Sequence, residues 1–309
     1  MVPGSSRLVG TSEGANFSLT FGNNGRMKIL VTGAGGQLGH DVVSHCQLLG
    51  DDVIGVSRAE LDVTQRDHVH AVISSLRPDV VINCAAWTAV DACESNREYA
   101  FTANALSVRW LREATARSAS HLVTISTDYV FDGTKIEPYD EWDTPNPQSI
   151  YGASKLAGER EAGPDAAIVR TSWVCGEHGS NMVATVLKLI NERDQLSFVD
   201  DQRGCPTFTA DLAPALRQLA VERRAGIHHL TNSRPVSWFE FVQEIVSAAG
   251  RDPSMVLPIS TSDLDPPRPA PRPMNSVLDN AVWRVAGLEP LRDHLEPLKE
   301  LVASLHGNN

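Results

Sequence analysis

Tyr151 and Lys155 lie four residues apart in the segment YGASK, so on a helix their side chains would share one face. A tyrosine of ordinary pKa, roughly 10, exchanges protons poorly at neutral pH. A neighbouring ammonium stabilises the phenolate and lowers that pKa, which suits the pair to acid–base chemistry. Such pairs are common by chance, but here the apolar run HLVTIST, which ends in Ser126 and Thr127, and a glycine-rich turn accompany it. Together they favour a catalytic role.

The glycine-rich segment TGAGGQLG, residues 32–39, follows directly on an apolar run. Gly33, Gly36 and Gly39 stand where a tight turn would open into a helix. Glycines let the backbone approach a pyrophosphate, and the helix N-terminus then stabilises the negative charge. In this strand, turn and helix context the segment predicts dinucleotide binding. Lys155 would then be placed to hold the hydroxyls of the nicotinamide ribose.

The end of the second predicted strand bears on the choice of coenzyme. NAD-binding folds place an acidic residue about 20 positions after the glycine turn, where it binds the ribose. Here the strand ends in Val56, Ser57 and Arg58, and a guanidinium could face a 2'-phosphate. This favours NADPH and leaves NADH possible. Asp62 and Val63, in the next turn, are placed to border the adenine, although Asp62 is also suited to capping a helix.

Short apolar runs alternate with helix-length segments from Met27 to about Thr171. Strands buried on both faces have this pattern, and the alternation predicts an α/β fold with a doubly wound parallel sheet of the Rossmann type. The predicted strands are residues 27–32, 52–57, 79–85, 121–127 and 166–171, and the main predicted helices between them are residues 65–76 and 96–118.

The chain divides into three predicted parts. Residues 1–26, rich in Gly, Ser and Asn, are interpreted as a disordered extension or a start-site artefact, with Met27 as the candidate true start. Residues 27–171 form the NAD(P)-binding domain. Residues 172–309 form mainly a smaller C-terminal substrate-binding lobe over the carboxyl edge of the sheet, and some of its segments return to the first domain.

The composition excludes several classes of protein. The 309 residues are 42% hydrophobic and contain no 18-residue apolar run, which predicts a soluble globular chain without a membrane span. A net charge of -11 without a Lys/Arg cluster argues against nucleic acid as a partner. The five cysteines are odd in number and lack a CxxC spacing, so they suit a reducing cytoplasm better than a disulfide framework or zinc knuckle.

Six segments resemble the dTDP-4-dehydrorhamnose reductases, a family of extended short-chain dehydrogenases/reductases, from Met27 nearly to the end of the chain. They are TGAGGQLG, VINCAAWTAVDACES, STDYVFDG, YGASKLAGE, RTSWV and DDQRGCPT. The resemblance implies reduction of the C4 ketone of dTDP-6-deoxy-L-lyxo-4-hexulose to dTDP-L-rhamnose with a nicotinamide cofactor. It also implies a cytoplasmic location and a possible homodimer.

The same resemblance implies roles for individual residues. The pyrophosphate turn is expected to consist of Gly36, Gln37 and Leu38, and the adenine edge of Asp62 and Val63. The wall along the cofactor is expected to consist of Ala85, Ala86 and Trp87. Thr127 is expected to polarise the substrate ketone and Tyr151 to donate the proton. Asp128 is expected to bind the sugar, and Trp173 to line its pocket.

Several positions depart from the family's pattern. Trp87 stands where the family more usually has His or Tyr, and Cys175 where it commonly has Tyr, so the pocket rim could differ. Cys205 replaces a usually small residue and is interpreted as a buried hydrophobe. Some members hold a magnesium ion between subunits through acidic residues, but the downstream part of that site falls near Ala210 here, so no such metal is expected.

Two further candidates lie in the C-terminal part. The Pro-rich tract at residues 265–273 is interpreted as a rigid edge of the sugar-nucleotide cleft rather than as a PxxP ligand. Within it, Arg272 is predicted to contact an anion of the substrate. His228 and His229 are adjacent on a predicted strand and would point to opposite faces, so they are not expected to chelate a metal.

Two other functions share some of these features. Nucleotide-sugar epimerases and dehydratases have the same fold and Tyr/Lys pair but retain their NAD, and such dehydratases place Glu where this chain has Tyr129. A catalytically silent regulator similar to the regulatory subunit of methionine adenosyltransferase would have no need of Thr127, Tyr151 and Lys155. The reductase is therefore the leading hypothesis.

Overall fold

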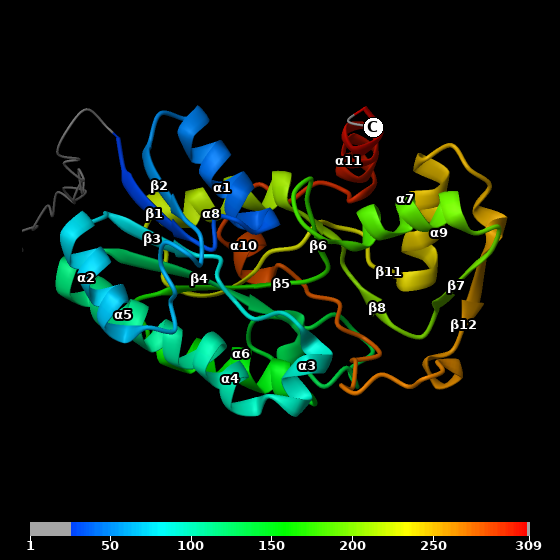
Figure 1. Ribbon diagram of the computed structural model, residues 1–309, viewed down its shortest axis with the longest axis horizontal. Coiled ribbons are helices and arrows are strands. Elements are labelled where there is room, and N and C mark those ends of the chain that lie inside the picture. Colours follow the sequence, from blue (N-terminus) through cyan, green and yellow to red (C-terminus); the bar gives the residue numbers. More distant parts are fainter. Residues whose placement is uncertain (1–25, 308–309) are drawn as a thin grey trace, which may run out of the picture.

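A six-stranded parallel sheet forms the centre of the protein in a computed structural model, which describes residues 26–307 (Figure 1). Its strands are β1 (Lys28–Thr32), β2 (Asp52–Val56), β3 (Val80–Asn83), β4 (His121–Thr127), β5 (Ala167–Thr171) and β10 (Gly226–His229). They lie in the order β10-β5-β4-β3-β1-β2, and every neighbouring pair is parallel. Each residue of β3 and β5 is buried, as expected of strands covered on both faces. The predicted doubly wound α/β fold is thus confirmed.

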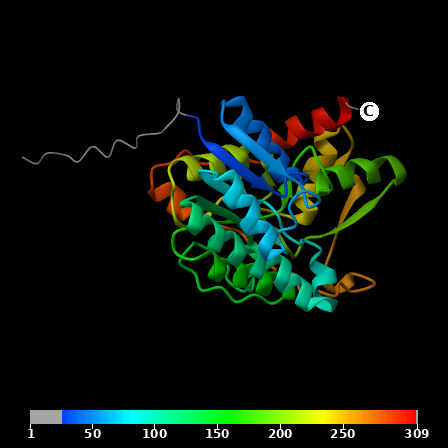
Figure 2. The ribbon, with the colours of Figure 1, turned by 60° about the vertical axis from the view of Figure 1, so that its left-hand side comes forward.

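Helices cover both faces of this sheet (Figure 2). The helices α1 (Gln37–Leu48) and α8 (Thr209–Val221) pack together on one face, where Val42 and Leu216 are fully buried. On the other face lie α2 (Arg66–Leu76), α5 (Ser107–Ser118) and α6 (Ile150–Ala162). Two separate apolar cores therefore fix the sheet between its helix layers.

The helix predicted over residues 96–118 is interrupted. The structure has α3 (Val90–Ser95), α4 (Arg97–Phe101) and a π-helical turn (Thr102–Leu106) before α5. The Asn104 side chain in that turn forms two hydrogen bonds with the backbone of Trp87. Its amide oxygen accepts from the Trp87 N–H at 2.8 Å, and its amide nitrogen donates to the Trp87 carbonyl. This pairing fixes the loop after β3, where Ala85, Ala86 and Trp87 lie.

A second packing unit lies beyond the carboxyl ends of the strands, on the right of Figure 1. Its helices are α7 (Met182–Glu192), α9 (Trp238–Ala248) and α11 (Leu295–Gly307). Its strand pairs are β7 (Leu196–Val199) with β12 (Val256–Ile259), β6 (Val174–Cys175) with β9 (Thr207–Phe208), and β8 (Arg203–Gly204) with β11 (Val236–Ser237). Phe241 and Leu298 are fully buried in its own apolar core.

Short elements complete the described part of the chain. They are the 3-10 turns Asp128–Val130, Pro253–Met255 and Thr261–Asp263 and the helix α10 (Ala281–Val285), whose Trp283 is buried against the sheet. Strand β10 joins the edge of the sheet beside β5, so a segment from the C-terminal part does return to the first unit. The predicted N-terminal extension lies, but for its last residue, outside the described residues. Over residues 26–307, no helix is both long and apolar enough to cross a bilayer.

Candidate active site

The glycine turn between β1 and α1 is built for close approach of a ligand to the backbone. Gly33 has φ +70°, and a Cβ added to it would lie 2.7 Å from the backbone nitrogen of Ala85, which only glycine avoids. Helix α1 starts after Gly36 with no side-chain cap and no acidic residue in its first turn. Its free N–H groups and the helix dipole therefore suit an anion such as a pyrophosphate.

A cavity of about 330 Å³ lies beside this turn. This cavity is lined by eight of the residues predicted to border a dinucleotide: Gly33, Gly36, Arg58, Asp62, Val63, Ala85, Ala86 and Trp87. The Arg58 side chain is 71% exposed, and its Nε lies 3.4 Å from Oδ2 of Asp62. Tyr99, which sequence reasoning missed, lines the cavity with its ring centroid 5.9 Å from the Arg58 guanidinium carbon. The cavity therefore presents a cation at its mouth.

A second cavity, of about 520 Å³, adjoins the first through Gly36, Cys84 and Ala86, which line both. Of the predicted glycine-turn residues, it is lined by Gln37, Leu38 and Gly39. It is also lined by the predicted catalytic and sugar-binding residues, with the exception of Arg272: Thr127, Asp128, Tyr151, Lys155 and Trp173. The structure thus joins the cavity beside the glycine turn to the Tyr/Lys pair, as expected for hydride transfer between a coenzyme and a small substrate.

Helix α6 places Tyr151 in its first turn. Its N-cap Ser149 accepts a hydrogen bond from the Gly152 N–H at 3.1 Å, which satisfies one of the free donors of the helix start. Gly152 packs against the carbonyl oxygen of Tyr129, where a Cβ would clash. The glycine in YGASK therefore lets α6 approach the end of β4, so that Tyr151 reaches the residues that follow this strand.

Tyr151, Thr127 and Asp128 form a buried chain of hydrogen bonds. The Tyr151 side chain bonds to the Thr127 side chain, and the Thr127 hydroxyl donates to Oδ1 of Asp128 at 2.9 Å. The Tyr129 N–H also reaches Thr127 Oγ1, at 3.3 Å. Thr127 therefore links the phenol of Tyr151 to the carboxyl of Asp128.

The pKa of Tyr151 differs from the expectation. Burial is the largest influence and raises the pKa above the ordinary value of tyrosine, while the Thr127 hydrogen bond lowers it only in part. The expected lowering by Lys155 is not among the influences on Tyr151, and the Lys155 Nζ donates to the Ile125 carbonyl at 2.6 Å. Burial in turn lowers the pKa of Lys155 to about 8. The tyrosine is therefore a protonated hydroxyl at neutral pH.

Asp128 is 2% exposed, and burial raises its pKa to about 6, partly offset by the hydrogen bond from Thr127. Its second oxygen, Oδ2, has no partner of normal hydrogen-bond geometry among the described residues, since the Ser276 hydroxyl donates instead to the Arg203 carbonyl. A buried acceptor without a full partner is costly, so this oxygen is suited to a ligand hydroxyl.

Two tryptophans form one wall of the larger cavity. Trp173 has φ +46° and stacks on Trp238, with ring centroids 3.5 Å apart and an interplanar angle of 8°. Trp238 was missed from the sequence. The pattern from Ser237 to Glu240 is typical of a capping box, and the structure has this capping box at the start of α9. Such a local pattern does not predict that Trp238 stacks on Trp173, which lies 65 positions upstream.

Arg272 lines neither of the two cavities. Its guanidinium holds both oxygens of Asp91, with Nη1 to Oδ1 at 2.5 Å and Nη2 to Oδ2 at 2.7 Å. Its charge is already paired, so anion binding by Arg272 stays a prediction. Cys175 and Cys205 are 2% and 3% exposed, and both thiols are free. Cys205 therefore packs as a buried small residue, as interpreted from the sequence.

The sequence and the fold of this chain are similar to those of known proteins over most of their length. Residues 27–306 match the family described as the RmlD substrate binding domain. A dTDP-4-dehydrorhamnose reductase of Streptomyces griseus is 42% identical over 91% of this chain and 95% of its own length. The crystal structure of a Clostridium acetobutylicum dTDP-4-dehydrorhamnose reductase superposes with a TM-score of 0.87 at 40% identity, covering 91% of this chain and 100% of that one.

A second solved structure includes a coenzyme. The dTDP-4-dehydrorhamnose reductase of Bacillus anthracis, in complex with NADP, superposes with a TM-score of 0.85 at 36% identity and covers 92% of this chain and 100% of that one. Similarity of this extent covers the sheet, the second packing unit and both cavities. On these matches, the chain belongs to the RmlD substrate binding domain family, that of the dTDP-4-dehydrorhamnose reductases.

Proposed function

We propose that this protein reduces the C4 ketone of dTDP-6-deoxy-L-lyxo-4-hexulose to dTDP-L-rhamnose and uses NADPH as the reductant. The observation that carries the proposal is the buried Tyr151–Thr127 hydrogen bond in a cavity that adjoins the dinucleotide groove. The names of the most similar relatives agree with it. The groove fits the coenzyme, because it offers the free N–H groups of α1 to a pyrophosphate and Lys155 to a ribose.

Bound NADPH supplies a hydride to C4 of the sugar. Tyr151 donates its proton to the C4 oxygen as the carbonyl becomes an alcohol, so one hydride and one proton account for the reduction. Burial favours the protonated tyrosine, which is the form that a reductase needs at the start of each turnover. Thr127 polarises the ketone from the same side when its hydroxyl proton, which points to Asp128 in the structure, turns to the ketone oxygen. Lys155, whose side chain lines the same cavity, is the group that would hold the hydroxyls of the nicotinamide ribose.

The sugar is held by Asp128 and the tryptophan wall. The unsatisfied Oδ2 of Asp128 accepts a sugar hydroxyl, and the Trp173 ring provides an apolar face for the sugar ring. Arg272 is the further candidate contact for the substrate's phosphates, and it would have to share its guanidinium between Asp91 and that anion. Arg58 is the group that would contact a 2'-phosphate of the coenzyme, since it lies exposed at the mouth of the smaller cavity.

A dehydratase is the nearest alternative, and the residue after Asp128 argues against it. Tyr129 stands where dehydration needs a second acid, and burial raises its pKa to about 12. A silent regulator would not need a buried Lys155 beside Tyr151. We further propose that the protein works in the cytoplasm as a homodimer without nucleic acid, an assembly that analytical ultracentrifugation can test.

The test is a coupled absorbance assay with purified protein, the dTDP-keto sugar and NADPH. We expect one NADPH oxidised per sugar reduced, with no oxidation when the sugar is omitted. A protein that binds NADPH and the sugar nucleotide but never oxidises NADPH would contradict the proposal and favour the regulator.

A further inference from the structure

Lys155 and Glu159 of α6 are both anchored to the end of β4. Lys155 Nζ donates to the Ile125 carbonyl at 2.6 Å, and the hydroxyl of the next residue, Ser126, donates to Glu159 Oε1 at 2.5 Å. Residues four apart on a helix share one face, so Glu159 continues the row of Tyr151 and Lys155 by one turn. The row on this face of α6 therefore consists of a phenol, an amine and a carboxyl group.

A buried ion pair fixes the Glu159 carboxylate. Arg170 of β5 donates from Nε to Glu159 Oε1 at 2.9 Å and from Nη2 to Oε2 at 2.7 Å. Glu159 is 7% exposed and Arg170 is 1% exposed. Bidentate pairs of this kind hold both partners in one geometry. With the Ser126 hydroxyl as a third donor, the carboxylate is held in place beside the row.

We propose that Glu159 is a positioning residue of the coenzyme site, whose carboxylate keeps the Lys155 side chain charged. This inference rests on the proposed function, in which Lys155 holds the ribose hydroxyls. Burial is unfavourable for an ammonium, and a carboxylate one helical turn away offsets part of that penalty. Glu159 does not line the larger cavity, so it acts through Lys155 and not on the substrate.

The influences on the pKa of Lys155 agree with this role. Burial is the largest and brings the pKa down to about 8, whereas Glu159 and then Cys84 act in the opposite direction. Burial also raises the pKa of the Cys84 thiol to about 12, so this group is uncharged at neutral pH. Glu159 is therefore the negative charge that opposes the effect of burial on Lys155.

The other ionisable groups nearby do not replace Glu159. Those that line the larger cavity with Lys155, or pair with Glu159, are Cys84, Asp128, Tyr129, Tyr151 and Arg170. Within the described residues, none of them but Cys84 is among the influences on the pKa of Lys155. On the helices packed against α6, Arg109 of α5 pairs with Glu161, and Glu94 of α3 accepts a backbone N–H at the start of α6.

The experiment measures the Kd for NADPH of the full chain by fluorescence titration, from neutral to alkaline pH. In the wild type the ammonium is lost as the pH rises through about 8, so the Kd should rise there, by about 5-fold or more. In Glu159→Gln the rise should come about one pH unit lower or more, because the opposite charge is gone. The glutamine keeps an acceptor for the Ser126 hydroxyl. A wild-type Kd that does not change with pH, or equal midpoints in both proteins, would overturn the proposal.

A double variant separates the charge of Glu159 from its structural contact. Glu159→Gln alone leaves Arg170 buried without its partner, which can destabilise the fold. Glu159→Gln combined with Arg170→Met leaves no unpaired charge, and circular dichroism checks that both variants are folded. We expect the double variant to keep the shift to lower pH, since Lys155 still lacks its carboxylate. Return of the wild-type midpoint would mean that Glu159 serves only Arg170, and would overturn the proposal.

Glu161→Gln is the matched control. Glu161 lies on the same helix and also pairs with an arginine, at 2.5 Å from Arg109, but its side chain is 25% exposed. It is not among the influences on the pKa of Lys155. The midpoint in Glu161→Gln should therefore equal that of the wild type, and a shift as large as in Glu159→Gln would contradict a specific role of Glu159.

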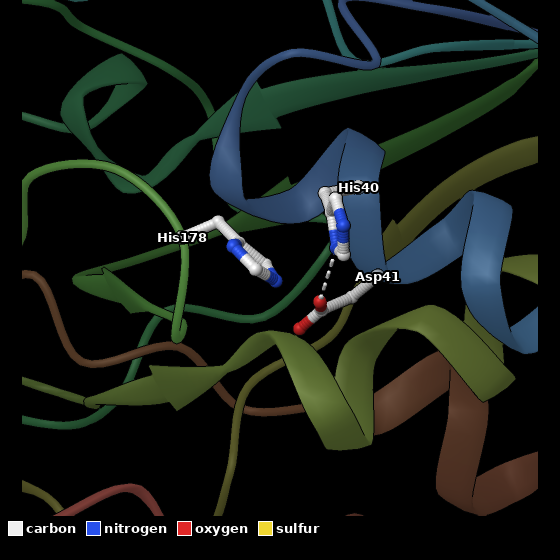
Figure 3. Close-up of side chains that lie close together, drawn as sticks. All are labelled: His40, Asp41 and His178. Atoms are coloured by element: carbon white, nitrogen blue, oxygen red, sulfur yellow. Dashed lines mark hydrogen bonds and ion pairs between the residues drawn. The ribbon is translucent and has the colours of Figure 1, made fainter. Parts of the chain in front are cut away.

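Two histidines near the glycine turn give a second control, because imidazole titrates close to neutral pH. The rings of His40, on α1, and His178, in the loop between β6 and α7, have centroids 3.6 Å apart, and His40 Nδ1 lies 3.3 Å from Asp41 Oδ1 (Figure 3). His178→Ala removes one ring of this contact and should leave the rise in the Kd at about pH 8 in place. A rise that moves in His178→Ala as it does in Glu159→Gln would show that the profile does not report Lys155, and would overturn the proposal.

These titrations need no turnover, so they are independent of the proposed reaction. A protein that shows the expected profiles but never oxidises NADPH with the dTDP-keto sugar would contradict the proposed function and leave the role of Glu159 in coenzyme binding standing.

Discussion

The ring of Trp238 lies flat on that of Trp173, with centroids 3.5 Å apart, although the two residues come from α9 and from the loop after β5. Trp173 itself stands in the left-handed backbone region at φ +46°, which is unfavourable for a bulky residue. The stacking partner therefore has a positioning role: it holds Trp173 in the orientation in which it lines the sugar cavity.

Removal of this partner should weaken substrate binding more than coenzyme binding. Aromatic pairs contribute about 0.5–1.5 kcal/mol beyond their buried area, and Trp238→Ala also opens the cavity wall. We expect the KM for the sugar nucleotide to rise about 10-fold, with the KM for NADPH little changed. Trp142→Ala, which removes a tryptophan that is 69% exposed, is the control. Equal KM values for the sugar in both variants would show that Trp238 has no part in the site.

Tyr151→Phe removes the transferable proton and keeps the ring. Turnover should fall about 100-fold or more, because general acid catalysis is lost. The Kd for NADPH, measured by fluorescence titration, should change little, and this separates a chemical defect from a folding defect. Full turnover in the phenylalanine variant would rule out Tyr151 as the proton donor.

Arg58→Ala tests the choice of coenzyme. A charge-assisted contact with a 2'-phosphate is worth roughly 1.5–3 kcal/mol, so the KM for NADPH should rise about 10-fold or more. NADH lacks the phosphate and serves as the internal control, and its KM should hardly change. A parallel increase for both coenzymes would mean that Arg58 is a surface charge paired with Asp62 and no more.

The pH dependence should reveal Lys155. Burial lowers its pKa to about 8, so the ammonium is present below that pH and is lost as the pH rises through it. Because kcat/KM reports groups of the free enzyme, kcat/KM for NADPH should fall above about pH 8. Lys155→Arg keeps the charge to higher pH, so its fall should move upward. A wild-type profile that is flat to about pH 9 would contradict this role.

The strands and the glycine turn could be predicted from the sequence because their signals are local. The five predicted strands lie within two residues of the observed ones at each end, since buried parallel strands are continuous apolar runs. The glycine turn is equally local: the positive φ of Gly33 and the missing Cβ of Gly39 are requirements of the backbone itself.

Features that depend on partners far apart in the chain could not be predicted. The Trp173–Trp238 stack, the Arg272–Asp91 pair and the His40–His178 contact each join residues at least 65 positions apart. The expected lowering of the Tyr151 pKa failed for a related reason. The spacing places Lys155 on the same face of the helix, but the depth of burial and the bond of Lys155 to Ile125 arise only in the folded chain.

The most direct test of the proposed reaction follows the path of the hydride. With NADPH that carries deuterium at the transferred position, we expect stoichiometric coenzyme oxidation and deuterium at C4 of the product sugar, read by mass spectrometry and NMR. Product formation without net oxidation of NADPH, or deuterium at C6, would mean that the coenzyme returns its hydride within one cycle, as in epimerases and dehydratases, and would contradict the assignment as a reductase.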